Sequence, residues 1–178
     1  MEMPKSNLHF MLMSLTFRVR DILVPPMRIL DEVGIKPGFH VLDYGCGPGS
    51  YLAPLAELVG EAGKVYALDI HPLAVERARR IASVRGLKNV EAILSGGKTG
   101  LPDRSVDVVL LYDTFHELSD PDGVLEELHR ILKPDGILSF SDHHLREEQV
   151  VSKVTGGGLF ELLRKHTKTY SFSKVCGR

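Results

Sequence analysis

The sequence of 178 residues predicts a doubly wound α/β fold, in which helices cover both faces of a mostly parallel sheet. Short apolar runs alternate along the chain with longer segments whose apolar residues recur at helical spacing. Most of these runs are continuously apolar, as expected of parallel strands buried on both faces. The last two runs have only a short segment between them, so they are expected to pair antiparallel as a C-terminal hairpin.

The segment before the first strand is expected to be helical. Apolar residues recur at spacings of three and four over residues 7–24, which predicts one helix or two short ones, and Pro25-Pro26 ends the segment. A second, shorter helix is expected over residues 27–33 and closes at Gly34.

Strands and helices then alternate to the end of the chain. Proline and glycine mark the helix ends: Pro72 begins one helix, Gly86 stops it, and Lys133-Pro134-Asp135-Gly136 stops the helix before the fifth strand. The expected strands cover residues 39–42, 64–68, 90–94, 106–112, 137–140, 160–166 and 169–175. The helices expected between them cover residues 51–59, 72–85, 122–132 and 146–154.

The composition is that of an ordinary globular chain, with 43% apolar and 25% charged residues. A formal net charge of −1 gives no reason to expect nucleic acid or an anionic membrane as partner. Cys46 and Cys176 are too few for a disulfide framework, and a cytoplasmic setting is expected. The apolar run over residues 8–15 falls far short of the ~20 residues that span a bilayer, so neither a membrane span nor a secretory signal is expected.

The segment after the first strand is the most informative about function. The strand ends at Asp43, and glycines then occupy alternate positions, at Gly45, Gly47 and Gly49, before the next helix. Glycines let the backbone approach a ligand closely, and a helix N-terminus directs N–H groups at an anionic group. This arrangement predicts a site for a nucleotide-like ligand.

The loop spacing and two acids narrow the choice of ligand. Dinucleotide-binding loops typically read G-x-G-x-x-G, and Asp43 would repel a pyrophosphate but could hold an ammonium group. Asp69, at the end of the second strand, can accept hydrogen bonds from a ribose diol; its alternative role is to cap the helix at Pro72. Adenosine joined to an amino acid, as in S-adenosylmethionine, fits this chemistry.

Four segments, in this order, resemble the signature motifs of class I S-adenosylmethionine-dependent methyltransferases. They are Val41–Gly49, Ala67–Ile70, Leu101–Val109 and Leu128–Leu138. The resemblance is strong over about residues 35–140 and is closest to small-molecule methyltransferases similar to those of quinone biosynthesis. It implies a Rossmann-like sheet of seven strands, with residues 35–178 as the S-adenosylmethionine-binding core and residues 1–34 as a helical cap over the cleft.

The resemblance also implies roles for individual residues. Gly45 and Gly47 would pack against the methionine part, Asp43 would organise its amino group, Asp69 would bind the ribose and Ile70 would lie against adenine. The full set of expected cofactor residues is Asp43, Tyr44, Gly45, Cys46, Gly47, Gly49, Asp69, Ile70, Ser95, Gly96 and Asp113.

The segment after the third strand departs from the family pattern. Family members often carry an acid there that binds the adenine amino group, whereas residues 95–100 contain none. Adenine is then expected to be held by backbone and by Ser95 or the aliphatic part of Lys98.

Candidate catalytic residues follow the fourth and fifth strands. Histidine suits a general base at neutral pH, so His116 and His143 or His144 are expected in that role, with Asp142 as the orienting partner. The alternative is that these side chains only line the cleft mouth or cap helices. Together with Glu117 they are also chemically competent for a metal, but the adjacent His143 and His144 would rarely converge on one ion, so no metal is expected.

The N-terminal helix is expected to shape an apolar acceptor pocket; alternatively it packs on a sheet edge or forms a dimer contact. The apolar side chains concerned are Phe10, Met11, Met13, Leu15 and Phe17. Little chain remains for a substrate domain, so a small acceptor, or a second subunit in a homodimer that completes the pocket, is expected.

The function predicted from the sequence is S-adenosylmethionine-dependent methyl transfer to a small molecule. Two alternatives remain: a non-catalytic protein that binds the same cofactor, and a nicotinamide-dependent oxidoreductase.

Overall fold

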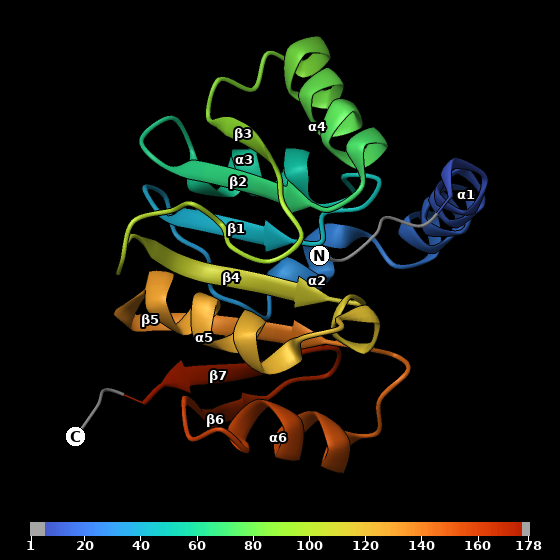
Figure 1. Cartoon of the computed structure of the whole chain (residues 1–178). Helices are drawn as coiled ribbons and strands as arrows, with labels where there is room; N and C mark the ends of the chain where they lie inside the picture. Colours follow the sequence, from blue (N-terminus) through green and yellow to red (C-terminus); the bar gives the residue numbers. More distant parts are fainter. Residues whose placement is uncertain (1–5, 176–178) are drawn as a thin grey trace.

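The computed structural model describes residues 6–175, except the side chains of His9, Met13 and Arg18, and it confirms the predicted doubly wound fold. A single seven-stranded sheet runs in the order β3-β2-β1-β4-β5-β7-β6 (Figure 1). Among the strands of residues 6–175, only the pairs β5–β7 and β7–β6 are antiparallel. The strands are β1 (His40–Tyr44), β2 (Lys64–Asp69), β3 (Val90–Leu94), β4 (Val106–Tyr112), β5 (Leu132–Ser141), β6 (Phe160–Lys165) and β7 (Tyr170–Lys174).

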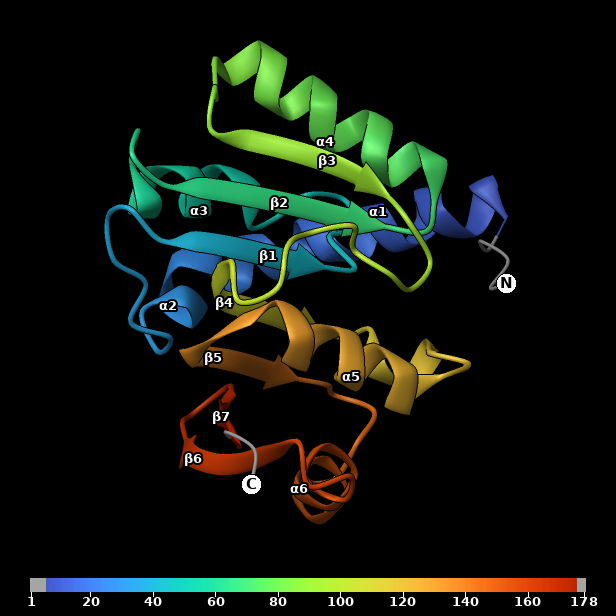
Figure 2. The ribbon, with the colours of Figure 1, turned by 60° about the vertical axis from the view of Figure 1, so that its left-hand side comes forward.

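Helices cover both faces of the sheet (Figure 2). Side chains of α5 and α6 pack on one face with the inward residues Leu42, Val109 and Leu138. Side chains of α2, α3 and α4 pack on the other face with Val41 and Val108. The helices are α1 (Asn7–Leu23), α2 (Pro26–Leu30), α3 (Leu52–Val59), α4 (Pro72–Arg85), α5 (Pro121–Ile131) and α6 (Glu147–Thr155), with a 3₁₀ turn η1 (Phe115–Glu117).

The fifth strand begins earlier than predicted. The turn residues 133–136 lie inside β5, which starts at Leu132 and pairs there with Val106. The register then shifts, so that Val108 pairs with Ile137. The proline and glycine therefore mark an irregularity in the strand, and the stretch predicted as a loop is accommodated as a bulge.

Helix α1 stands beside the carboxyl ends of the parallel strands, where their arrowheads point in Figure 1. Three contacts attach it there. Phe10 stacks on His71 after β2, Arg20 pairs with Asp113 after β4, and Asp21 accepts a hydrogen bond from the Ser50 hydroxyl. No helix among residues 6–175 is both long and apolar enough to cross a membrane.

Candidate active site

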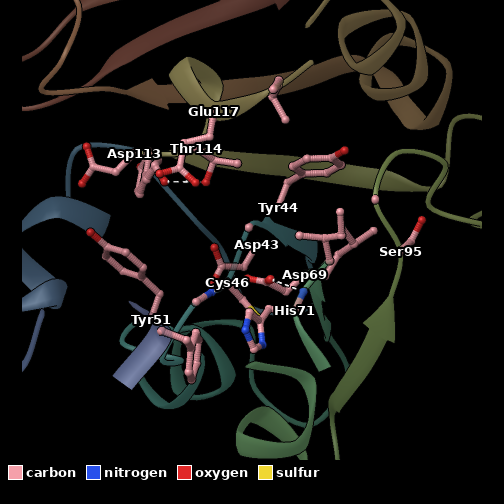
Figure 3. Close-up of a pocket in the computed structure, with 18 of the residues that line it drawn as sticks. Asp43, Tyr44, Cys46, Tyr51, Asp69, His71, Ser95, Asp113, Thr114 and Glu117 are labelled. Carbon is pink, nitrogen blue, oxygen red and sulfur yellow. Dashed lines mark hydrogen bonds between the residues drawn. The ribbon is translucent and has the colours of Figure 1, made fainter. Parts of the chain in front are cut away.

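A pocket of about 360 Å³ opens at the carboxyl ends of β1, β2 and β4 (Figure 3). Every expected cofactor residue except Gly49 lines it. The loop after β3 contributes Ser95 and Gly96, and α1 contributes Phe10 and Phe17. This is the edge of a doubly wound sheet at which ligands bind, near the point where the strand order reverses between β1 and β4.

The glycine loop is held tightly against β2 and the end of β4. The amides of Gly45 and Cys46 both donate to the Leu68 carbonyl, at 2.8 and 2.9 Å. Gly45 has a φ of 80°, and a Cβ at this position would come within 2.2 Å of the Thr114 hydroxyl oxygen. Only glycine satisfies both conditions, so the loop backbone itself forms this wall of the pocket.

Gly49 differs from Gly45 and Gly47 in that it does not line the pocket. Its φ is 82°, and an added Cβ would lie 2.7 Å from Ile81 Cδ1 of α4. The missing side chain therefore makes room for contact between the loop, α3 and α4. The expectation of a direct ligand contact at this glycine finds no support in the pocket lining.

Asp43 is the most unusual group in the pocket. Its side chain is 2% exposed, and its Oδ2 has no hydrogen-bond partner among the described residues. Burial, with a further contribution from the Asp69 carboxylate and an opposing one from Arg20, raises the pKa of Asp43 to about 7. A buried carboxylate oxygen without a partner is costly, so it points to a missing donor of positive charge.

Asp69 is oriented by two backbone amides. The amide of Gly47 donates to Oδ2 and the amide of His71 donates to Oδ1, both at 2.8 Å. Burial raises the pKa of this carboxyl as well. Each carboxylate oxygen keeps a further lone pair, so the group can still accept hydrogen bonds from a ligand.

The loop after β3 is held by hydrogen bonds within the loop and by one from β1. The Ser95 hydroxyl donates to the Lys98 carbonyl at 2.5 Å, and the Tyr44 hydroxyl donates to the Gly97 carbonyl at 3.3 Å. Lys98 does not line the pocket. Ser95 and Gly96 are therefore the residues through which this loop meets a ligand.

The far end of the pocket is formed by β4 and α1. Asp113 has a φ of 50°, uncommon for a residue other than glycine, and its carboxylate lies 3.4 Å from the Arg20 guanidinium and 2.7 Å from His143 Nδ1. The Arg20 guanidinium also lies over the rings of Phe17 and Tyr51. Burial raises the pKa of the Tyr51 hydroxyl, which therefore stays protonated at neutral pH.

The predicted catalytic residues lie beside the pocket and do not line it. His116 Nδ1 lies 2.9 Å from Asp142 Oδ2, and the His144 amide donates to the other oxygen of that carboxylate. On the opposite side of the ring, His116 Nε2 lies 3.5 Å from Glu117, which does line the pocket. Asp142 therefore orients His116, whereas His143 pairs with Asp113.

Metal-binding side chains do not converge at this site. Among the described residues, no three histidine, cysteine, aspartate or glutamate side chains lie close enough to hold an ion. The rings of His116 and His144 instead lie against each other at a tilt of 43°, with centroids 4.0 Å apart.

A family model described as a methyltransferase domain matches residues 35–173. The chain belongs to this family.

The relatives of this methyltransferase domain act on different molecules. Aklanonic acid methyltransferase DauC of Streptomyces sp. (strain C5) is 38% identical over 115 residues, which are 64% of this chain and 52% of the relative. Demethylmenaquinone methyltransferase of Geobacillus stearothermophilus is 32% identical over 104 residues, 58% of this chain and 44% of the relative. The chain thus spans about half the length of the curated relatives it matches.

A solved structure agrees with this assignment over most of both chains. A SAM-dependent methyltransferase from Aquifex aeolicus superposes with a TM-score of 0.78 and 34% identity, covering 88% of this chain and 93% of that one. Together these matches make S-adenosylmethionine the cofactor of the methyltransferase domain.

Several pocket residues of the methyltransferase domain escape prediction from sequence. His71, Tyr51 and Thr114 line the pocket without belonging to any motif considered above. His71 had a local signal, since it immediately precedes Pro72 at the start of a helix, but this signal indicates only a helix cap. Tyr51 and Thr114 join the site through tertiary packing, which has no local signature.

Proposed function

We propose that the protein transfers a methyl group from S-adenosylmethionine to a small-molecule acceptor. The observation that carries this proposal is the buried Asp43 carboxylate oxygen, which lies in the pocket without a partner. An amino acid ammonium group supplies the positive charge and the donors that this oxygen lacks. The pyrophosphate of a dinucleotide would bring negative charge to the same place.

The remaining pocket residues fit the rest of the cofactor. The Gly45 and Gly47 backbone would face the methionine part, Asp69 would accept hydrogen bonds from the ribose, and Ile70 with Ser95 would flank the adenine. When bound, S-adenosylmethionine supplies an electrophilic methyl group on a sulfonium. The chain then has to align the acceptor with that methyl group and exclude water, and both require a covered pocket.

The cover is proposed to come from residues 1–34. Phe10 and Phe17 of α1 line the pocket, and Arg20 reaches the Asp113 end. Met11 and Leu15, also expected to line it, instead face a groove beside α4, and the side chain of Met13 lies outside the described residues. We propose a small acceptor, in keeping with the relatives that are named for aklanonic acid and demethylmenaquinone.

We propose His116 as the general base where the acceptor must lose a proton. The buried Asp142 carboxylate holds one ring nitrogen, and the other nitrogen faces Glu117 at the pocket. A proton can thus pass from the acceptor region through Glu117 or water to His116. His143 and His144 are proposed as flanking groups, the former fixing Asp113.

A second copy of the chain is proposed to cover the outer face of α1. Seven apolar side chains on that face are between 54% and 79% exposed: Leu8, Met11, Leu12, Leu15, Val19, Ile22 and Leu23. Exposed apolar side chains gathered on one helix face mark an interaction site, and a second copy of the chain would bury the same face on both partners. We also propose a cytoplasmic location, supported by the buried free thiol of Cys46, and no role for nucleic acid.

Calorimetric titration with S-adenosylmethionine, S-adenosylhomocysteine and NAD separates the proposal from its alternatives. We expect the protein to bind S-adenosylmethionine and S-adenosylhomocysteine and not to bind NAD. Binding of NAD alone would contradict the proposed function. A turnover assay would then offer the protein a panel of phenols, carbon acids and amines as acceptors. If S-adenosylmethionine binds but no acceptor leads to release of S-adenosylhomocysteine, a non-catalytic protein would be favoured.

The role of His116 is tested by His116→Ala on an acceptor found in that panel. Turnover should fall by about 10²–10⁴, the range for a general base, with little change in cofactor affinity. His144→Ala, which removes the neighbouring ring but keeps the pair between His116 and Asp142, is the control. Equal losses of turnover and affinity in His116→Ala would indicate a structural role instead.

A further inference from the structure

His71 is a pocket residue with a fixed orientation and an unused donor. It follows Asp69 by two positions, is 6% exposed and lies close to that carboxylate in Figure 3. Two contacts hold its ring. The Leu73 amide donates to Nδ1 at 3.2 Å as the N-terminal cap of α4, and the Phe10 ring stacks on the imidazole at a centroid distance of 4.7 Å.

The cap determines where the ring proton lies. A nitrogen that accepts a hydrogen bond carries no proton, so the neutral imidazole has its proton on Nε2. Nε2 is buried and has no hydrogen-bond partner among the described residues. Since buried donors are almost always paired, an N–H group left unpaired in a ligand pocket indicates that the ligand provides the acceptor.

The neighbouring Asp69 offers the opposite chemistry. As a carboxylate it only accepts hydrogen bonds, and its two oxygens already receive the amides of Gly47 and His71. A sugar hydroxyl that donates its proton to such a carboxylate keeps lone pairs that need a donor. His71 Nε2–H is a donor on the same strand end, fixed by α4 on one side and by α1 on the other.

We propose that His71 donates a hydrogen bond from Nε2 to a ribose hydroxyl of the cofactor, so that Asp69 and His71 hold the ribose as an acceptor–donor pair. This inference rests on the cofactor placement proposed above. It makes His71 a positioning residue for the cofactor. Through the stacked Phe10, it also connects the ribose subsite to the helix that covers the pocket.

The test combines a substitution with ligand analogues. His71→Ser keeps a side-chain oxygen that can cap α4 but removes the Nε2 donor. Calorimetry would compare the wild type and this variant with S-adenosylhomocysteine and with its 2′-deoxy and 3′-deoxy analogues. The variant should bind S-adenosylhomocysteine about tenfold more weakly than the wild type does, as expected for one lost hydrogen bond. For the one analogue that lacks the partner hydroxyl, the variant and the wild type should have the same affinity.

The outcomes separate this inference from the proposed function. Equal affinity of both proteins for S-adenosylhomocysteine, or the same loss with all three ligands, would overturn the role of His71 while leaving cofactor binding intact. Failure of the wild type to bind S-adenosylhomocysteine would instead contradict the proposed function.

A second measurement does not depend on the variant folding. In the wild-type protein, the ¹H–¹⁵N signal of His71 Nε2 should move downfield when S-adenosylhomocysteine is added. It should not do so with the deoxy analogue that lacks the partner hydroxyl. A signal that is insensitive to every ligand would contradict the proposed contact.

Discussion

At the scale of single residues, the ionised Asp43 carboxylate favours binding of a cationic ligand but destabilises the folded protein without one. Its carboxylate is buried beside Asp69, and this raises its pKa to about 7 in the folded protein. Because the folded pKa lies above the usual 3.8, the group favours the folded state at acid pH, and this contribution is lost as the pH rises through 7. A cationic ligand reverses the balance by pairing with the ionised form.

Asp43→Asn tests this conflict in the free protein. The asparagine side chain does not titrate. The quantity to follow is the difference in unfolding free energy between the wild type and the variant, and only its change with pH reports on the Asp43 carboxyl. Between pH 4 and pH 8 that difference should move in favour of the variant by on the order of 4 kcal/mol. Denaturant unfolding across this range measures it, and a difference that stays constant would show that Asp43 is not strained by burial.

Gly45 offers a second residue-scale prediction, with Gly38 as a matched control. Both have a positive φ, but nothing lies within 4 Å of a Cβ at Gly38, whereas at Gly45 the Thr114 side chain blocks it. Gly38→Ala should lower the unfolding free energy by about 1 kcal/mol and leave cofactor affinity unchanged. Gly45→Ala should lose more stability and also weaken S-adenosylmethionine binding, because the loop must move away from Thr114.

The Gly45 prediction has its own internal check. The double variant Gly45→Ala/Thr114→Ala should recover part of the lost affinity, since the blocking side chain is gone while the strained φ remains. If Gly45→Ala behaved like Gly38→Ala in both measurements, the close approach of the loop to the end of β4 would be unimportant for binding.

At the scale of elements, α1 has two apolar faces with different uses. The inner face presents Phe10 and Phe17 to the pocket, and the outer face leaves its apolar stripe exposed. Exposed apolar side chains gathered on one face usually mark an interaction site, so the outer face is expected to be covered. The proposed second copy of the chain gives this stripe a partner.

Leu12→Glu tests whether a second copy of the chain packs on the outer face of α1. The variant should shift the protein from dimer to monomer in light scattering at micromolar concentration, because a charge at the centre of the stripe opposes burial. Leu163→Glu, at an exposed apolar position on the edge strand β6, is the control and should leave the mass unchanged. A wild type that is monomeric at every concentration would contradict the proposed dimer.

Helices and strands were easier to predict from the sequence than the side-chain contacts that they bring together. Helical spacing and the proline and glycine at its ends predicted α4 at its observed bounds, because both signals are local. The predicted start of β5 was wrong, because a proline and a glycine within a bulge give the same sequence signal as a loop. Likewise, the sequence predicted Asp142 as the orienting partner of the histidines after β4 and β5, but it could not show that His143 would pair with Asp113 instead. The pairs His116–Asp142 and His143–Asp113 arise from loops 26 and 30 residues apart in sequence.

At the scale of the whole molecule, the site is a property of the topology. Parallel strands carry their final acids to one edge, so Asp43, Asp69 and Asp113 meet there although they come from β1, β2 and the end of β4. This is why strand-end acids could be selected from sequence. The stacking of Phe10 on His71 could not, because it depends on how α1 folds over that edge.

The central claim is that the Asp43 carboxylate binds the ammonium group of S-adenosylmethionine, and proton-linked binding tests it most directly. Affinity should be measured by calorimetry from pH 5 to pH 6.5, where the α-amino group of the ligand, with a usual pKa of about 7.7–8.0, stays protonated. Below pH 7 the wild type should gain up to about tenfold in affinity per pH unit and release a proton on binding, because Asp43 must ionise to bind the cation. Asp43→Asn should bind weakly with no such slope. A wild-type affinity independent of pH, or the same slope in Asp43→Asn, would contradict the account.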